Sequence, residues 1–144
     1  MLKTQQYLRT GGTLEMLEKH YAIKANRSKA HSSLVLLKYN QIDSPMGSDV
    51  VQECRGLVLD EANNWGIVSH PFHKFFNHGE GHAAQIDWAS AIYLEKIDGS
   101  LMQLYFYDGK WNVASSGHPD AAGRVGERGR HPDRPRGTPQ GLLA

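Results

Sequence analysis

Short apolar runs separated by turn residues constrain the fold of this chain more than any other feature. Asp108-Gly109 lies between two such runs and is the dipeptide type that most strongly favours a two-residue hairpin turn. Tight turns of this kind join neighbouring strands, so antiparallel pairing should dominate. The predicted strands cover residues 33–39, 50–60, 65–69, 91–96, 101–107 and 110–115.

Helical signals are confined to the first part of the chain. Thr13 is a plausible N-cap, and Leu14, Leu17 and Tyr21 follow at helical spacing, which predicts one helix near residues 13–25. Residues 79–90 connect elements, with a helical turn near residues 83–89. The predicted fold class is α+β, a mainly antiparallel sheet with one or two helices.

Length and composition are typical of one intracellular domain. The 144 residues suit a single domain, and the net charge of +1 does not by itself indicate a nucleic-acid partner. The single cysteine, Cys54, fits a reducing compartment and a small buried hydrophobic role. No apolar run reaches the ~18 residues of a membrane span, and residues 1–6 lack the apolar core of a signal peptide. These features predict a cytoplasmic protein without a membrane partner, and they indicate no oligomeric state.

The composition of the sequence changes after Gly117. Residues 118–144 hold five Arg, five Gly and four Pro without an aromatic residue, which predicts a disordered tail behind a domain of residues 1–117. Two interpretations stay open. A native basic tail would add weak, salt-sensitive RNA affinity. Alternatively, a truncation or frameshift introduces foreign sequence between Gly117 and about Arg130.

The stretch 93–101 carries the strongest chemical signal. Lys96 ends an apolar run, and Asp98-Gly99-Ser100 follows as a turn. A lysine there can act as a nucleophile toward a phosphate that approaches the glycine closely, provided that burial or neighbouring cations lower its pKa from ~10.4. Taken alone, K-x-D-G is weak, and a hairpin turn with a solvated lysine explains it equally well.

Two upstream motifs make the pattern specific: Glu53-Cys54-Arg55-Gly56, and the seven residues 71–77, which read PFHKFFN. Together with residues 93–101, they resemble the T4 RNA ligase 1-like family of ATP-dependent RNA ligases over roughly residues 33–117. That family belongs to the covalent nucleotidyltransferases, and the resemblance implies the N-terminal part of such an adenylation domain.

The resemblance implies a role for each motif residue. Lys96 would be the nucleophile that attacks the α-phosphorus of ATP, while Arg55 and Lys74 would hold the triphosphate. Phe76, Glu95, Asp98 and Gly99 would complete the nucleotide site. The sequence leaves open whether Glu95 acts through its backbone or its carboxylate, and its alternation with Lys96 along a strand favours the backbone. Phe72 and Phe75 are expected in the core.

Implied partners are ATP, Mg²⁺, and RNA ends carrying a 5′-phosphate and a 3′-hydroxyl. AMP would pass from the lysine to the 5′-phosphate, and the 3′-hydroxyl would then attack. Mg²⁺ would be bound largely through the phosphates, and we assign no metal-ligating residue. Four histidines between residues 70 and 82 suggest zinc only weakly, because structural zinc sites mostly use thiolates.

Departures from the family pattern leave alternatives open. Ser116 stands where the family usually has a basic residue, and the family's downstream glutamates and closing lysine pair have no counterpart in the 48 residues after Lys96. The alternatives are another covalent nucleotidyltransferase (a DNA ligase or a capping enzyme) or a catalytically inactive nucleotide- or RNA-binding fragment.

Overall fold

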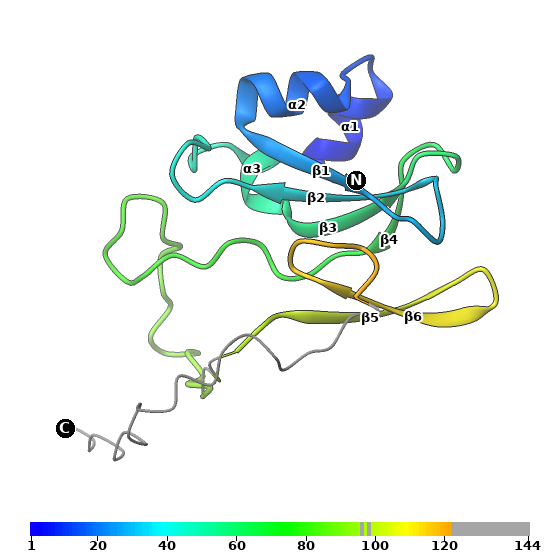
Figure 1. The fold of residues 1–144 in the computed structure, drawn as a ribbon. Coiled ribbons are helices and arrows are strands. Elements are labelled where there is room, and N and C mark those ends of the chain that lie inside the picture. The colour runs from blue at the N-terminus through cyan, green and yellow to red at the C-terminus, as the bar shows by residue number, and fades with distance from the viewer. Residues whose placement is uncertain (96, 98, 122–144) are drawn as a thin grey trace, which may run out of the picture.

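The computed structural model describes residues 1–95, 97 and 99–121. Within them, three helices and six strands follow one another along the chain (Figure 1). The helices are α1 (Lys3–Arg9), α2 (Leu14–Tyr21) and α3 (Asp49–Glu53). The strands are β1 (Ile23–Arg27), β2 (Leu34–Tyr39), β3 (Arg55–Asp60), β4 (Gly66–Ser69), β5 (Met102–Tyr107) and β6 (Lys110–Ser115).

The strands form two antiparallel sheets. The first contains β1, β2, β3 and β4 in that order, and the second is the β5–β6 hairpin. The predicted α+β class with antiparallel pairing is therefore confirmed. The hairpin turn at Asp108-Gly109 is also confirmed: both residues have positive φ, 51° and 72°, as a type I′ turn requires.

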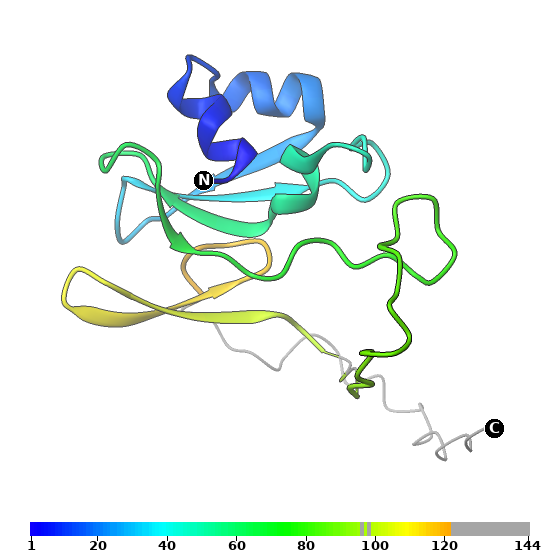
Figure 2. The same ribbon diagram turned by 180° about the vertical axis from the view of Figure 1, so that it is seen from behind.

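Both faces of the four-stranded sheet are covered. Helices α1 and α2 pack on one face, and the β5–β6 hairpin lies across the other (Figures 1 and 2). Side chains of β2 alternate between the two cores: Val35 and Leu37 pack on the helix side, and Leu34 and Leu36 on the hairpin side. This explains why β2 reads as an uninterrupted apolar run.

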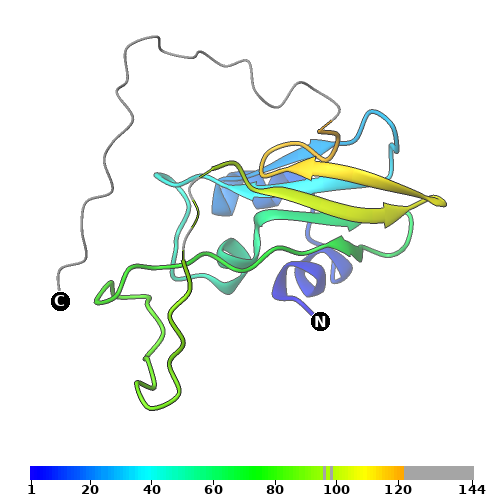
Figure 3. The same cartoon turned by 90° about the horizontal axis from the view of Figure 1, so that it is seen from below.

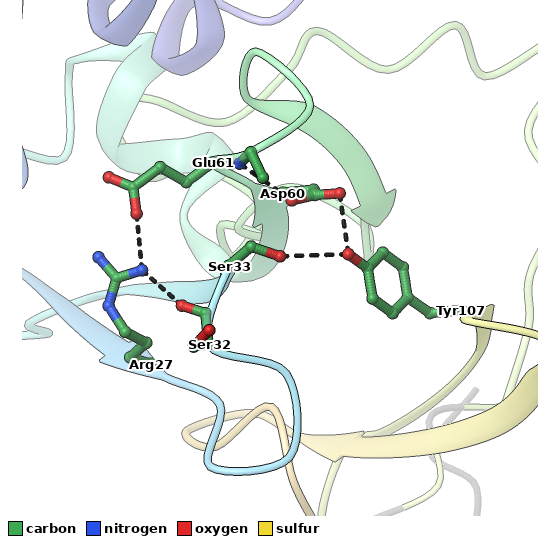
Figure 4. A network of polar contacts seen from close by, with 7 residues as sticks. Arg27, Ser32, Ser33, Asp60, Glu61 and Tyr107 are labelled. Carbon is green, nitrogen blue, oxygen red and sulfur yellow. Dashed lines mark hydrogen bonds and ion pairs between the residues drawn. The ribbon is translucent and has the colours of Figure 1, made fainter.

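A polar network ties the hairpin to the sheet. The hydroxyl of Tyr107, at the end of β5, donates to Asp60 Oδ2 at 3.0 Å and lies 3.1 Å from Ser33 Oγ (Figure 4). Asp60 is only 7% exposed, so its carboxylate depends on the Tyr107 hydroxyl and on the backbone N–H of Ala62. The neighbouring Arg27–Glu61 ion pair is solvent-exposed and contributes little.

The predicted strand over 50–60 is wrong in its first half, which is helix α3. The reason is a tertiary contact of Glu53. Its carboxylate, 4% exposed, accepts hydrogen bonds from the backbone N–H groups of Lys3 and Thr4, both at 2.9 Å, and from Thr4 Oγ at 2.7 Å. Glu53 thus satisfies free N–H groups at the start of α1, a helix that the sequence did not predict.

The predicted helix over 13–25 ends earlier, at Tyr21. Ala22 adopts a left-handed conformation, φ 52°, and β1 begins at the next residue. Residues 23–25 follow the sheet because Ile23 and Ala25 pair with Tyr39 and Leu37 of β2. The pairing of β1 with β2 therefore outweighs the helical spacing of apolar residues in the sequence.

The predicted strand over 91–96 is also wrong in its described part. Residues 91–95 form no strand, and Ile92, Tyr93 and Leu94 are 83%, 84% and 86% exposed. No described strand pairs with this run, so its apolar composition does not produce a sheet. Residues 83–89 contain no helix, and a single turn is closed there by the hydrogen bond from the Ser90 backbone N–H to the Asp87 carbonyl. Part of the segment between β4 and β5 extends away from the two sheets (Figure 3), whereas Lys74 and Phe75 contact α3 and β3.

Residues 118–121 pack against the domain. The Tyr105 hydroxyl donates to the carbonyl of Pro119 at 2.9 Å, and Asp120 accepts from Ser28 Oγ at 2.7 Å. The rest of the tail predicted to be disordered, 122–144, lies outside the described residues. None of the helices in the described part of the chain has the length and apolar character of a membrane crossing.

Candidate functional site

A β-bulge determines where Arg55 lies. Leu37 pairs with Leu57, but the next residue of β2, Lys38, pairs with Arg55, so Gly56 is an extra residue in β3. In a regular strand of the same sequence, Arg55 would lie on the same face as Leu57, the helix side of the sheet. The bulge instead places Arg55 opposite Lys38, on the hairpin side.

The conformation of the bulge requires glycine at position 56. Gly56 has φ +102°, and a Cβ there would lie 2.9 Å from Gln103 Nε2 and 3.4 Å from the Ser116 carbonyl oxygen. The Gln103 amide, in turn, donates to the Gly56 carbonyl at 2.8 Å. The glycine of the C-R-G motif therefore lets β5 and the 116–117 segment approach β3 closely.

A first cavity of about 690 Å³ opens beside Arg55, within the size range of small-molecule sites. Its described lining residues include three cations and no carboxylate. They come from the ends of β1, β2 and β3, from the residues just before β5 and from the segment after β6. The lining residues are Lys24, Lys38, Tyr39, Asn40, Gln41, Arg55, Gly99, Ser100, Leu101 and Ser116.

A second cavity, of about 700 Å³, lies on the other side of Arg55. It includes Lys74 and has a more apolar wall than the first. The Arg55 guanidinium lies over the Phe75 ring, 5.2 Å from its centroid. Phe72 and Phe75 are 77% and 62% exposed, so the prediction that they belong to the core is wrong. They form the wall of this open cavity instead.

Lys74 is held by aromatic rings. Its Nζ lies 5.7 Å from the Tyr39 ring centroid and 5.2 Å from that of Phe76. Its backbone N–H donates to the Gln52 carbonyl at 3.1 Å, which fixes the segment against the end of α3. Lys74 and Phe76, both predicted site residues, are therefore in contact, and Tyr39 is a neighbour that the sequence did not indicate.

The predicted site residues around the nucleophile are only partly described. Gly99 lines the first cavity together with Arg55, whereas Glu95 is exposed and lines neither of the two cavities. Lys96 and Asp98 lie outside the described residues. The expected alternation of Glu95 and Lys96 presupposed a strand that residues 91–95 do not form.

Lys24 and Lys38 are cavity residues that sequence reasoning missed. They occupy matching register positions on β1 and β2. A lysine within an otherwise buried strand, as Lys38 is in β2, was the available signal. Its partner could be found only from the pairing of the strands.

Other titratable groups near the site are explained by their packing. Cys54 is fully buried, as predicted, and burial raises the pKa of its thiol to about 12, with the Glu53 carboxylate adding to this and a Thr4 hydrogen bond opposing it. Partial burial lowers the pKa of His70, and the nearby His73 lowers it further. Among the described residues, no three His, Cys, Asp or Glu side chains are grouped to hold a metal ion.

Sequence comparisons identify the family. The family model described as RNA ligase matches residues 53–132, more than half of the chain and all three motifs. The chain belongs to the RNA ligase family. The match extends beyond Gly117 into the segment where the composition changes.

Two curated relatives are similar to this RNA ligase family member. A protein of Autographa californica nuclear polyhedrosis virus, named as a bifunctional polynucleotide kinase/RNA ligase, is 31% identical over 127 residues, covering 81% of this chain and 18% of the viral protein. An RNA ligase of Rhodothermus phage RM378 is 30% identical over 99 residues, covering 53% of this chain and 22% of the phage protein. The chain thus spans about a fifth of the length of these relatives. No solved structure matches the chain.

Proposed function

We propose that this chain carries out the nucleotide-transfer chemistry of an ATP-dependent RNA ligase, with Lys96 as the residue that becomes covalently bound to AMP. The observation that carries this proposal is the position of Arg55. It lines one cavity with Gly99 and the other with Lys74, so residues of all three motifs meet around one guanidinium. Residues 55, 74 and 99 are far apart in the sequence, and the fold brings them together.

In the first step, the uncharged amine of Lys96 attacks the α-phosphorus of ATP. An N–P bond forms, the bond from the α-phosphorus to the bridging oxygen breaks, and pyrophosphate leaves with the electron pair, while the amine loses a proton to solvent. Charge accumulates on the phosphate oxygens, and fixed cations stabilise it without having to reorganise. Arg55 and Lys74 are the cations assigned to this role.

Contacts in the structure support these assignments. Stacking on Phe75 restricts the Arg55 guanidinium, and the rings of Tyr39 and Phe76 restrict the Lys74 amine. Restricted cations lose less side-chain entropy when they bind an anion. Phe76, Glu95, Asp98 and Gly99 complete the proposed nucleotide site, with Gly99 allowing close approach of a phosphate.

The later steps act on RNA. AMP is transferred from Lys96 to an RNA 5′-phosphate, and the 3′-hydroxyl of a second end then displaces AMP to form the phosphodiester bond. The names of the viral and phage relatives support RNA as the substrate. Mg²⁺ would bind largely through the phosphates of the nucleotide.

The direct test is covalent labelling of the purified chain with ATP radiolabelled at the α-phosphate. Products are analysed under neutral or alkaline denaturing conditions, because a phosphoramidate is acid-labile. We expect label on the wild type and none on Lys96→Ala, with Lys110→Ala, an exposed lysine of β6, labelled as the wild type. An unlabelled wild type would contradict the proposal and favour an inactive binding fragment.

Substrate preference separates the remaining enzyme classes. ATP should label in preference to GTP, and nicked RNA should accept AMP in preference to nicked DNA. A preference for GTP would indicate a capping enzyme, and a preference for DNA would indicate a DNA ligase.

A further inference from the structure

Three cations stand side by side across three strands. Lys24 of β1 pairs with Lys38 of β2, and Lys38 pairs with Arg55 of β3. Neighbouring strands are about 4.8 Å apart, so the three side chains form a continuous row on the hairpin side of the sheet. We call Lys24, Lys38 and Arg55 the cation row.

The cation row is unfavourable in the free protein. Like charges directly opposite each other on neighbouring strands repel. None of the three side chains has an ion-pair partner among the described residues. The Gly56 bulge places Arg55 in the row, and without it Arg55 would face the helices. An arrangement that concentrates repulsion in this way indicates an anionic ligand that relieves it.

The row also has space for a ligand. All three side chains line the first cavity, and no carboxylate is among its described lining residues. The Ser116-Gly117 segment closes one side: the Asn26 side chain donates to the Gly117 carbonyl at 2.6 Å, and Lys38 Nζ lies 3.8 Å from where a Cβ on Gly117 would be. Gly99 and Ser100 close another side.

We propose that Lys24 and Lys38 extend the Arg55 site into a polyphosphate-binding subsite that holds phosphate groups beyond the one attacked by Lys96. This inference rests on the proposed function, because that function supplies the phosphates. The chemistry is shared by two sources, the β- and γ-phosphates of a nucleotide and the 5′-terminal phosphate of an RNA strand. Neither lysine contacts the reacting phosphorus in this assignment. Both lysines bind the phosphate groups and hold them in position.

Equilibrium binding tests the subsite without requiring catalysis. The two probes are inorganic tripolyphosphate, measured by calorimetry, and a single-stranded RNA with a 5′-phosphate, compared with the same RNA ending in a 5′-hydroxyl. Lys24→Ala and Lys38→Ala should each weaken binding of at least one phosphate probe by about five- to tenfold. In the RNA arm, each should reduce the logarithmic salt slope by about 0.7. The arm that loses affinity identifies the source of the phosphate.

The matched control is Lys110→Ala, which removes the same charge from an exposed position of β6 outside the cavity. It should bind like the wild type.

A charge-relocation variant distinguishes binding from folding: Ser116→Lys, which places an amine in the same cavity, should restore most of the affinity lost in Lys38→Ala. The melting temperature of Lys38→Ala should equal or exceed that of the wild type, since repulsion is removed.

Unchanged affinity in both arms for Lys24→Ala and Lys38→Ala would overturn the proposal. An equal loss in Lys110→Ala would overturn it as well, because the effect would then be one of net charge. Failure of the proposed function gives a different result: the wild type would take no label from ATP, while the cation-row variants would still lose phosphate affinity.

Discussion

Cys54 shows how strongly burial changes the chemistry of a single residue in this fold. Its side chain is fully buried beside Thr4 and Glu53, between α1 and the sheet, and its pKa is raised from 9.0 to about 12. A thiol that stays protonated is a poor nucleophile and a poor metal ligand. The cysteine of the C-R-G motif therefore acts as a packing residue next to Arg55.

The raised pKa predicts a loss of stability at high pH. Above pH 9 the unfolded chain releases the thiol proton while the folded chain keeps it, so folding is progressively disfavoured up to about pH 12. The expected contribution is a decrease of up to about 1.4 kcal/mol in unfolding free energy per pH unit. Urea denaturation between pH 8 and pH 11 measures it. Cys54→Ala, less stable overall, should lack this part of the slope, and identical slopes in both proteins would contradict the assignment.

At the scale of the element, β3 illustrates why an irregular strand can be a functional one. A regular strand would turn Arg55 toward the helix-side core, where an unpaired guanidinium would be costly. One extra residue, Gly56, redirects it to the cavity. The bulge thereby converts a buried, apolar strand into one that presents a cation at its beginning.

The bulge should be intolerant of a side chain. Gly56→Ala introduces a Cβ at φ +102° and within 2.9 Å of Gln103 Nε2, and we expect a loss of about 2 to 3 kcal/mol in unfolding free energy by urea denaturation. Gly79→Ala is the matched control. It has a similar φ of +86° but nothing within 4 Å of the added Cβ, so its cost should be about 1 kcal/mol or less. Equal losses would show that the contact with Gln103 is unimportant.

At the scale of the whole molecule, the described chain consists of a well-packed layered body and an exposed apolar segment. The four-stranded sheet is covered on both faces, whereas residues 91–95, which lead to Lys96, are unpaired and solvent-exposed. Apolar side chains exposed in this way contribute nothing to the stability of the body. The burial of apolar side chains is therefore concentrated in the layered body.

This division predicts a steep contrast in amide hydrogen exchange. Amides of residues 92–94 should exchange about a thousandfold faster than those of residues 34–39 in β2, since exchange from β2 requires opening of the packed body. Mass spectrometry of peptic fragments resolves the two segments. Comparable protection in both would mean that the apolar run 91–95 is paired in solution, as its composition first suggested.

The fold could be predicted from the sequence where the signals are local. The Asp108-Gly109 turn and the run 34–39 were found correctly, because turn chemistry and an uninterrupted apolar run act over a few residues. Helix α3 was missed because the contact that favours it is distant in sequence: the Glu53 carboxylate accepts hydrogen bonds from backbone N–H groups at the start of α1. The end of α2 was misplaced because residues 23–25 gain more from pairing with β2 than from continuing a helix.

For the candidate site, the sequence by itself indicated the motif residues Arg55, Lys74 and Gly99, since each lies in a short motif that resembles one of a known family and can be read along the chain. Only the tertiary structure decided that Lys24 and Lys38 join Arg55. The three side chains lie side by side because of the register of three strands and the Gly56 bulge. A one-residue change in register reverses which face a side chain occupies, and that register is decided by packing between residues distant in sequence.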